Sequence, residues 1–163
     1  MSVDMNMNIL IVDDYKTMLR IIRNLLKQLG FNNVDEATDG SMALQKLRDK
    51  DYGLVISDWN MEPMTGIQLL REVRADLKLK AMPFIMVTAE SKTENVIAAK
   101  KAGVNNYIVK PFNAQTLKTK IERGPVALEE AVEITCQIAE GFPAAHARGI
   151  IHRDIKPPNI VLT

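Results

Sequence analysis

The sequence predicts an α/β fold in which helices cover both faces of a parallel sheet. Apolar runs typical of buried strands alternate with amphipathic stretches typical of helices, and the alternation occurs five times between residues 8 and 123. Such strand–helix units join through right-handed crossovers, so all five strands run parallel. The predicted strands are residues 8–13, 33–37, 53–58, 84–88 and 106–109, and the predicted helices are residues 16–29, 40–49, 65–75, 92–102 and 113–123.

Local signals justify these elements in chain order. Apolar runs define the strands, for example Ile9–Val12 in the first and Phe84–Val87 in the fourth. In the first helix five apolar side chains share one face, and Gly30 follows where glycine commonly ends a helix. Gly103 gives the same signal after the fourth helix. The five apolar side chains are Met18, Ile22, Leu25, Leu26 and Leu29.

Composition limits the class of protein. The 163 residues carry a net charge of +1, so charge gives no sign of a nucleic-acid or membrane partner. Hydrophobic residues make up 47%, which fits a globular protein. The single Cys136 cannot form an internal disulfide, no apolar run is long enough to span a membrane, and Met1–Met5 lack a signal-peptide pattern. We therefore expect a cytoplasmic protein.

The chain changes character near Gly124–Pro125. All nine Met residues lie before that point, whereas both His residues and four of the seven Pro residues lie after it. We therefore predict two segments of different origin, a domain at residues 1–123 and a second segment at residues 124–163.

Polar side chains stand at the same end of four predicted strands: Asp13, Asp14, Asp58, Thr88 and Lys110. Parallel strands share one edge at their carboxyl ends, where open α/β sheets place their sites. Three carboxylates, a hydroxyl and an ammonium at one edge indicate a site for a divalent metal and a phosphoryl group. A structural role is the alternative for single residues, because Asp14 is also placed to cap the helix near Lys16.

Several short stretches match one known family: Leu25–Lys27, Leu29–Val34, Val55–Met61, Met86–Glu90, Glu94–Asn95 and Lys110–Phe112. Through them residues 8–123 resemble the receiver domain of two-component response regulators, and within that family the CheY-like chemotaxis regulators. The resemblance covers about three quarters of the chain. It implies a flavodoxin-like sheet with strand order 2-1-3-4-5.

The resemblance also implies a site. Asp58 is the nucleophile that accepts a phosphoryl group, and Lys110 binds a phosphoryl oxygen. Asp14 and Asp58 ligate Mg²⁺, Asp13 holds the ion through water, and the backbone carbonyl of Asn60 completes the set. Mg²⁺ agrees with the residue types, because clustered carboxylates repel one another and a hard cation removes the conflict.

A switch is implied at two further residues. Thr88 hydrogen-bonds the phosphoryl group, and the ring of Tyr107 enters the space that the Thr88 hydroxyl leaves. The alternative is a half-buried Tyr107 with its hydroxyl in water. Asn60 and Glu90 each lie two residues beyond a site residue, so we expect them to control how readily water attacks the aspartyl phosphate.

Two neighbours of the site have alternative roles. Trp59 follows the nucleophile and is expected at the mouth of the site, although core packing would also explain an aromatic there. The resemblance implies a cis bond between Lys110 and Pro111, whereas Pro111 could also simply end a strand.

The resemblance implies partners as well. The phosphodonor is a sensor histidine kinase, and the output surface at residues 92–123 binds the flagellar motor switch protein. A phosphatase is a further candidate partner. Lysines make this surface basic, which suits an acidic peptide, although a solvated basic face is the simpler explanation. They are Lys92, Lys100, Lys101, Lys118 and Lys120.

The second segment resembles the catalytic-loop region of a bacterial Ser/Thr protein kinase. His152–Leu162 carries the matching residues, with Asp154 in the place of the catalytic base, Lys156 beside it and Asn159 in the place of a metal ligand. The Gly-rich loop, the strand lysine and the Asp-Phe-Gly site of a kinase are absent from the sequence, and about 40 residues cannot build a kinase core. We predict no kinase activity.

Two functions follow. The first is a phosphorylation-dependent signalling switch, a phospho-acceptor and not a conventional enzyme. The alternative is a chimera whose kinase-derived segment serves structure or assembly and impairs signalling. We expect the second segment to form a helix at 127–139 and an extended stretch at 150–162. These elements would pack on the 92–123 surface or pair two chains as a homodimer.

Overall fold

The computed structural model describes residues 3–89 and 92–122. The strands are β1 (Ile9–Val12), β2 (Val34–Ala37), β3 (Leu54–Asp58), β4 (Phe84–Thr88) and β5 (Asn106–Val109). The helices are α1 (Lys16–Gln28), α2 (Gly40–Asp49), α3 (Gly66–Ala75), α4 (Thr93–Lys101) and α5 (Ala114–Glu122). All strand pairs are parallel, in the order β2-β1-β3-β4-β5, so the predicted flavodoxin-like fold is confirmed.

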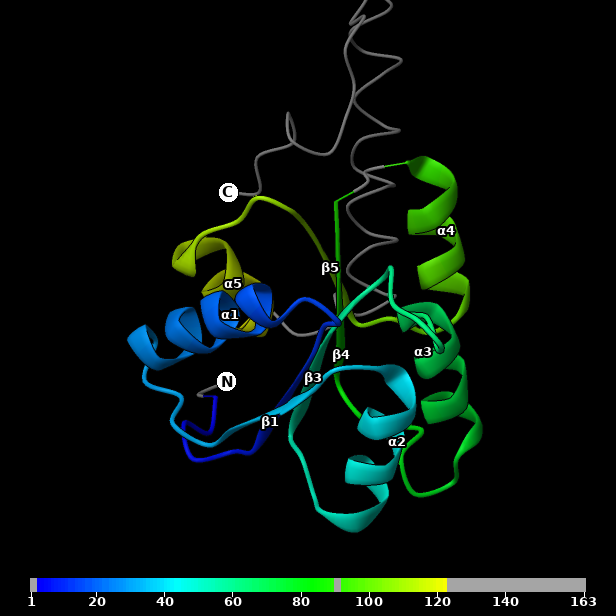
Figure 1. Cartoon of the computed structure of the whole chain (residues 1–163), viewed down its shortest axis with the longest axis horizontal. Helices are drawn as coiled ribbons and strands as arrows, with labels where there is room; N and C mark the ends of the chain where they lie inside the picture. Colours follow the sequence, from blue (N-terminus) through cyan, green and yellow to red (C-terminus); the bar gives the residue numbers. More distant parts are fainter. Residues whose placement is uncertain (1–2, 90–91, 123–163) are drawn as a thin grey trace, which may run out of the picture. The chain divides into compact units, whose positions relative to one another are not determined.

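The sheet separates two hydrophobic cores. Figure 1 shows α1 and α5 on one face of the sheet and α2, α3 and α4 on the other. Successive side chains of a strand point to opposite faces. In β1, Ile9 and Ile11 therefore belong to the core beneath α1 and α5, whereas Leu10 and Val12 belong to the core beneath α2 and α3. Burial on both faces explains why β1 is apolar throughout.

Glycines end two helices as predicted. Gly30 follows α1 with a φ of +96°, and Gly103 follows α4 with a φ of +89°, a region that few other residues adopt. Within the predicted apolar face of α1, Ile22 and Leu26 are buried. Leu19 is buried beside them and was missing from the predicted face.

Several predictions lie outside the described residues: Glu90, the helix at 127–139, the stretch at 150–162, and Asp154, Lys156 and Asn159. They stay predictions, as does the boundary between residues 123 and 124. Among the helices that the structure describes, none is long and apolar enough to cross a membrane.

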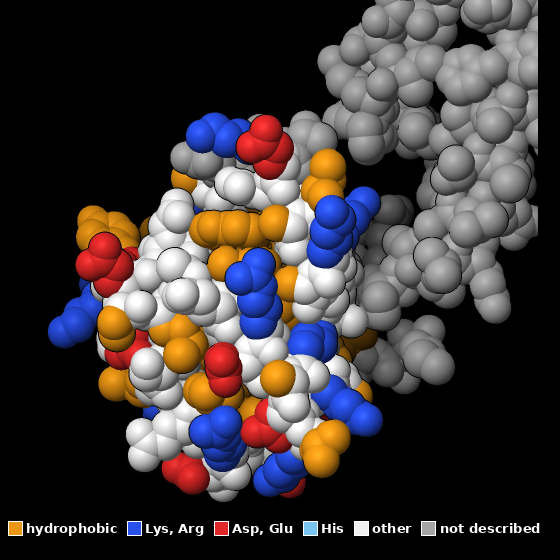
Figure 2. All heavy atoms as spheres, turned by 90° about the vertical axis from the view of Figure 1, so that its right-hand side faces the viewer, with side chains coloured by type: hydrophobic (Ala, Val, Ile, Leu, Met, Phe, Trp, Pro, Cys, Tyr) orange, Lys and Arg blue, Asp and Glu red, His pale blue; other side chains and the backbone are white. Residues whose placement is uncertain are grey.

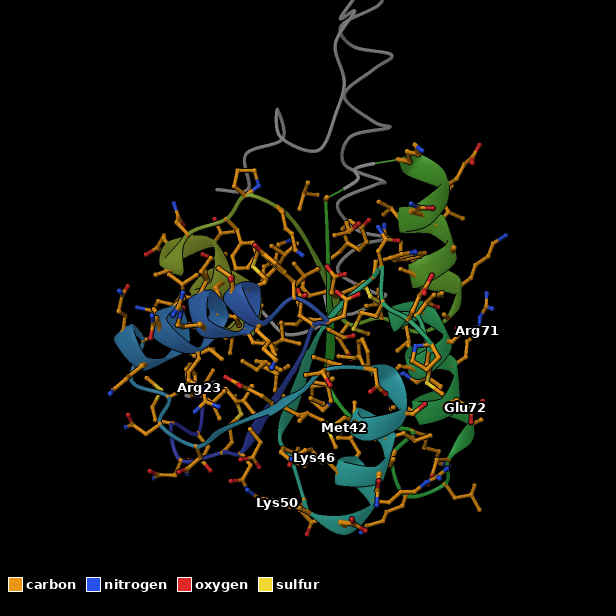
Figure 3. The ribbon with its side chains drawn as sticks, in the orientation of Figure 1. Arg23, Met42, Lys46, Lys50, Arg71 and Glu72 are labelled. Atoms are coloured by element: carbon orange, nitrogen blue, oxygen red, sulfur yellow. The ribbon has the colours of Figure 1, made fainter. Side chains whose placement is uncertain are left out.

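A polar cluster joins β2, an edge strand, to the segment between α2 and β3. Lys50 Nζ and Tyr52 Oη each donate to Asp35 Oδ2 at 2.8 Å, and Lys50 Nζ lies 5.4 Å from the centre of the Tyr52 ring (Lys50 is labelled in Figure 3). The hydrogen bonds from Lys50 and Tyr52 lower the pKa of Asp35, whereas burial and the neighbouring Asp35 raise the pKa of Tyr52. Charged groups on an edge strand discourage pairing with another chain.

We expect Tyr52→Phe to lower the free energy of unfolding by about 1 kcal/mol at neutral pH, because the Asp35 carboxylate loses a hydrogen bond. Since the folded-state pKa of Asp35 lies below its ordinary value, this stabilisation is present above about pH 4 and disappears as the pH falls through the folded-state pKa. Urea unfolding at neutral and acidic pH, followed by the fluorescence of Trp59, measures both effects.

The control is Tyr15→Phe, at a tyrosine that is 64% exposed. Equal losses of stability in the two variants, or a loss in Tyr52→Phe that does not shrink in acid, would contradict the assignment.

Candidate functional site

The carboxyl ends of four strands bring polar side chains to one edge of the sheet. β3 pairs with β1 on one side and with β4 on the other, and β5 follows beyond β4. Asp13, Asp58 and Thr88 are 1%, 7% and 1% exposed, so three polar side chains are buried there. Lys110, directly after β5, has a side chain that is 22% exposed. The sequence therefore predicted correctly which end of the sheet holds the polar cluster.

Lys110 joins two carboxylates. Its Nζ donates to Asp58 Oδ1 at 2.6 Å and to Asp13 Oδ2 at 3.3 Å. The remaining oxygens accept from the backbone: Tyr15 N–H donates to Asp13 Oδ1 at 2.8 Å, and Asn60 N–H donates to Asp58 Oδ2 at 2.9 Å. Each carboxylate thus has one oxygen held by a backbone N–H and the other held by the Lys110 side chain.

The charges of the cluster are only partly balanced. Burial raises the pKa of Asp13, and the Asp58 charge adds to this, although the Tyr15 N–H and Lys110 oppose it. Burial alone would lower the pKa of Lys110, but the hydrogen bond and charge of Asp58, followed by those of Asp13, hold it above its ordinary value. Two carboxylates share one ammonium, so the site has a net negative charge that favours a further cation.

The other predicted site residues lie around this cluster. Asp14 is exposed, and Asn60 is exposed beside Asp58. Tyr107 is partly buried on β5, in register with Met86 of β4. Thr88 ends β4, and its carbonyl accepts from Lys110 N–H at 2.7 Å.

The structure bears on three of the alternatives. The N-cap of α1 is Tyr15, without a side-chain cap, so Asp14 does not cap this helix. Trp59 is partly buried and packs against the core beneath α2 and α3, so it contributes to core packing, the alternative considered for it. The bond between Lys110 and Pro111 is cis, as the resemblance implied.

The oxygen atoms at this edge of the sheet are of the chemical types that bind a hard cation. Carboxylates of Asp13, Asp14 and Asp58 and the carbonyl of Asn60 are ligands that Mg²⁺ prefers. Within the described residues, however, no three carboxylate, His or Cys side chains converge on one point as metal ligands, because Asp14 stands in solvent and Lys110 lies between the other two. The donor chemistry fits Mg²⁺.

Gly66, which sequence reasoning did not single out, fixes the position of the Asp58 backbone. It is the first residue of α3, and a Cβ there would lie 2.0 Å from the Asp58 carbonyl oxygen and 2.9 Å from Met86 Sδ. Gly66 N–H donates to the Trp59 carbonyl at 2.9 Å. Only glycine allows α3 to begin this close to the end of β3. A glycine at the second position of the helix predicted at residues 65–75 was the available signal, since glycine is a poor helix former.

The fold and the site agree with what comparisons of the sequence show. Residues 9–122 match the model of the response regulator receiver domain. The chain therefore belongs to the response regulator receiver domain family, and within it is CheY-like. It is 57% identical over 118 residues to chemotaxis protein CheY-3 of Vibrio cholerae, covering 72% of this chain and 91% of that protein. It is 58% identical over 117 residues to chemotaxis protein CheY of Pseudomonas aeruginosa, covering 72% and 94%.

Solved structures give the same result. CheY4 of Vibrio cholerae superposes with a TM-score of 0.68 at 33% identity, covering 72% of this chain and 98% of that one. The receiver domain of the sensor histidine kinase PA1611 of Pseudomonas aeruginosa has a TM-score of 0.67 at 27% identity, covering 72% and 96%. That PA1611 structure carries a magnesium ion in its active-site cleft.

We expect Gly66→Ala to lower the free energy of unfolding by about 1–3 kcal/mol, because a backbone carbonyl cannot move aside as a side chain can. Gly40→Ala is the matched control, since Gly40 is also the first residue of a helix but the three atoms nearest to its Cβ would all belong to the side chain of Met64. Urea unfolding compares the two variants. If Gly40→Ala costs as much as Gly66→Ala, the contact with Asp58 is not what requires glycine.

Proposed function

We propose that the chain is a phosphorylation-dependent signalling switch in which Asp58 accepts a phosphoryl group from a sensor histidine kinase. The observation that carries the proposal is the contact of the buried Asp58 carboxylate with Lys110 at 2.6 Å, at the carboxyl end of a central strand. Membership of the receiver family and 57% identity to a chemotaxis protein support it.

In the proposed reaction an Asp58 carboxylate oxygen attacks phosphorus. A P–O bond forms to Asp58 while the bond from phosphorus to the donor's histidine nitrogen breaks, and the electron pair leaves with that nitrogen. Asn60 N–H keeps Oδ2 in place. Lys110 moves from Oδ1 to a phosphoryl oxygen, so its charge stays within the site. When bound, Mg²⁺ would supply further positive charge to the phosphoryl oxygens. The groups that would hold the ion are Asp14, Asp58, the Asn60 carbonyl and, through water, Asp13.

The proposed switch connects this chemistry to β4 and β5. The Thr88 hydroxyl turns to the phosphoryl group, and the ring of Tyr107 enters the space that it leaves. Two observations support the idea: Thr88 is buried beside the site, and Tyr107 lies on the neighbouring strand with its side chain only partly covered.

The proposed output surface consists of α4, β5 and α5. Ile97 is 46% exposed and Val109 is 39% exposed. α4 carries Lys100 and Lys101, and α5 carries Lys118 and Lys120. Figure 2, which views the molecule from the side of α3 and α4, shows Lys and Arg side chains beside hydrophobic ones. A short amphipathic, acidic helix suits such a surface. The flagellar motor switch protein is the proposed partner, and a phosphatase is a second candidate.

We expect Asp58→Asn to abolish incorporation of acid-labile phosphate from acetyl phosphate and Mg²⁺, because the amide is not a nucleophile. Chelation of Mg²⁺ has the same effect on the unmodified chain. Phosphate incorporation into the intact protein, measured by mass spectrometry, checks both. Asp49→Asn, at an exposed aspartate of α2, serves as control and incorporates phosphate normally. Undiminished incorporation in Asp58→Asn refutes the assignment.

We expect the double variant Asn60→Ala/Glu90→Ala to change the dephosphorylation rate by about tenfold, the effect of ~1.4 kcal/mol on the barrier. Asn60 is exposed beside Asp58, so its side chain can direct or obstruct an attacking water. Phosphate release after removal of acetyl phosphate measures the rate. Asn24→Ala/Glu72→Ala, at exposed positions on α1 and α3, is the control (Glu72 is labelled in Figure 3). An unchanged rate in the Asn60/Glu90 variant rules out this role.

A further inference from the structure

A second polar network lies at the opposite end of the sheet from Asp58, where β4 and β5 begin. At its centre is Arg74, in the last turn of α3. Its Nη1 donates to the Met82 carbonyl at 2.7 Å and to the Lys80 carbonyl at 3.1 Å. Its Nε donates to the Gly103 carbonyl at 2.9 Å, and its Nη2 to Asn105 Oδ1 at 2.8 Å. One guanidinium thus joins the α3–β4 loop to the turn between α4 and β5.

Every recorded partner of Arg74 is a neutral oxygen. None of the ion pairs recorded between described residues includes it, so the ends of peptide and amide dipoles compensate its charge. Burial lowers the pKa of Arg74, yet a guanidinium stays charged at any ordinary pH. Lysine cannot replace this planar arrangement of donors.

The contacts continue into the strands and the end of α4. Asn105 Oδ1 also accepts from Phe84 N–H at 2.7 Å, and Asn105 N–H donates to the Phe84 carbonyl at 3.0 Å. A Cβ on Gly103 would lie 3.1 Å from Arg74 Nε, so the turn packs directly on the guanidinium. Val104 N–H donates to the Ala99 carbonyl of α4 at 3.0 Å. The C-terminal end of α4 is therefore tied to α3, which Figure 1 shows beside it.

The N-terminal end of α4 is the end nearer in sequence to the proposed phosphorylation site, because the helix begins five residues after Thr88. Among the α4 side chains that the structure describes, only that of Ala99, near the C-terminal end, is buried.

We propose that Arg74 is a positioning residue that fixes the C-terminal end of α4, so that phosphorylation moves α4 about that end. This inference rests on the proposed function, because it assumes that Asp58 is phosphorylated. Over the nine residues of α4, about 14 Å long, a pivot at one end gives the largest displacement at the N-terminal end, next to Thr88.

Hydrogen exchange of the full chain, with and without acetyl phosphate and Mg²⁺, tests the proposal. The variants are Arg74→Met, which keeps a long apolar side chain but removes all donors, and Arg74→Lys, which keeps the charge. Arg71→Met is the matched control, because Arg71 is exposed on the same helix (labelled in Figure 3). Circular dichroism shows whether each variant folds, and Arg74→Lys serves if Arg74→Met does not.

Without phosphate, we expect exchange at Gly103–Asn105 to rise by about tenfold in Arg74→Met, to rise less in Arg74→Lys and to be unchanged in Arg71→Met. With acetyl phosphate, the unmodified chain and Arg71→Met change exchange in the first turn of α4 alone, whereas Arg74→Met changes it along the whole helix. Phosphate incorporation stays within about twofold in all variants, because Arg74 lies far from Asp58.

Three outcomes overturn the inference. Unchanged exchange at Gly103–Asn105 in Arg74→Met shows that Arg74 does not fix the turn. A response along all of α4 in the unmodified chain shows that there is no pivot. An unmodified chain that takes up no phosphate overturns the proposed function together with the pivot, and the comparison without phosphate then still decides whether Arg74 fixes the turn.

Discussion

The site depends on one ammonium shared by two buried carboxylates. Lys110 follows β5, whereas Asp58 ends β3, and β4 lies between them. Strands two places apart in a sheet are about 10 Å apart, so a long side chain is needed to cross that gap. The contacts of Lys110 Nζ with Asp58 and Asp13 therefore require the strand order, and loss of Lys110 would leave two buried carboxylates without a counter-charge.

This partial compensation suits the proposed phosphorylation of Asp58. A fully neutralised cluster would have no affinity for a further cation, and an uncompensated one would take up protons instead. Here burial and Asp58 raise the pKa of Asp13 although Lys110 lowers it, so some repulsion remains. Asp58 Oδ2 accepts from the Asn60 main chain, while Oδ1 accepts from the Lys110 ammonium. An incoming phosphoryl group can replace one partner of Asp58 without disturbing the other.

The sequence was informative where a residue's role follows from its place on a strand. Burial on both faces produces continuous apolar runs, and the polar residue after each run marks the edge of the sheet, which located Asp58 and Lys110. Contacts between distant segments leave no such pattern. A glycine near the start of a predicted helix is a signal, but the sequence does not show which atoms Gly66 meets or that Arg74 binds the turn at Gly103. Both contacts depend on how α3 packs against neighbouring strands. The strand order itself came from family resemblance and not from periodicity.

The two ends of β4 differ in how their side chains are held, and this difference suits a switch. At the carboxyl end, Thr88 is next to a cluster in which one ammonium serves two carboxylates, so its environment changes when that charge moves. At the amino end, Phe84 N–H donates to Asn105 Oδ1, which also accepts from Arg74 Nη2, one of the four contacts that Arg74 makes with neutral oxygens. In the proposed pivot, a helix held at its C-terminal end moves most at its N-terminal end, which belongs to the proposed output surface.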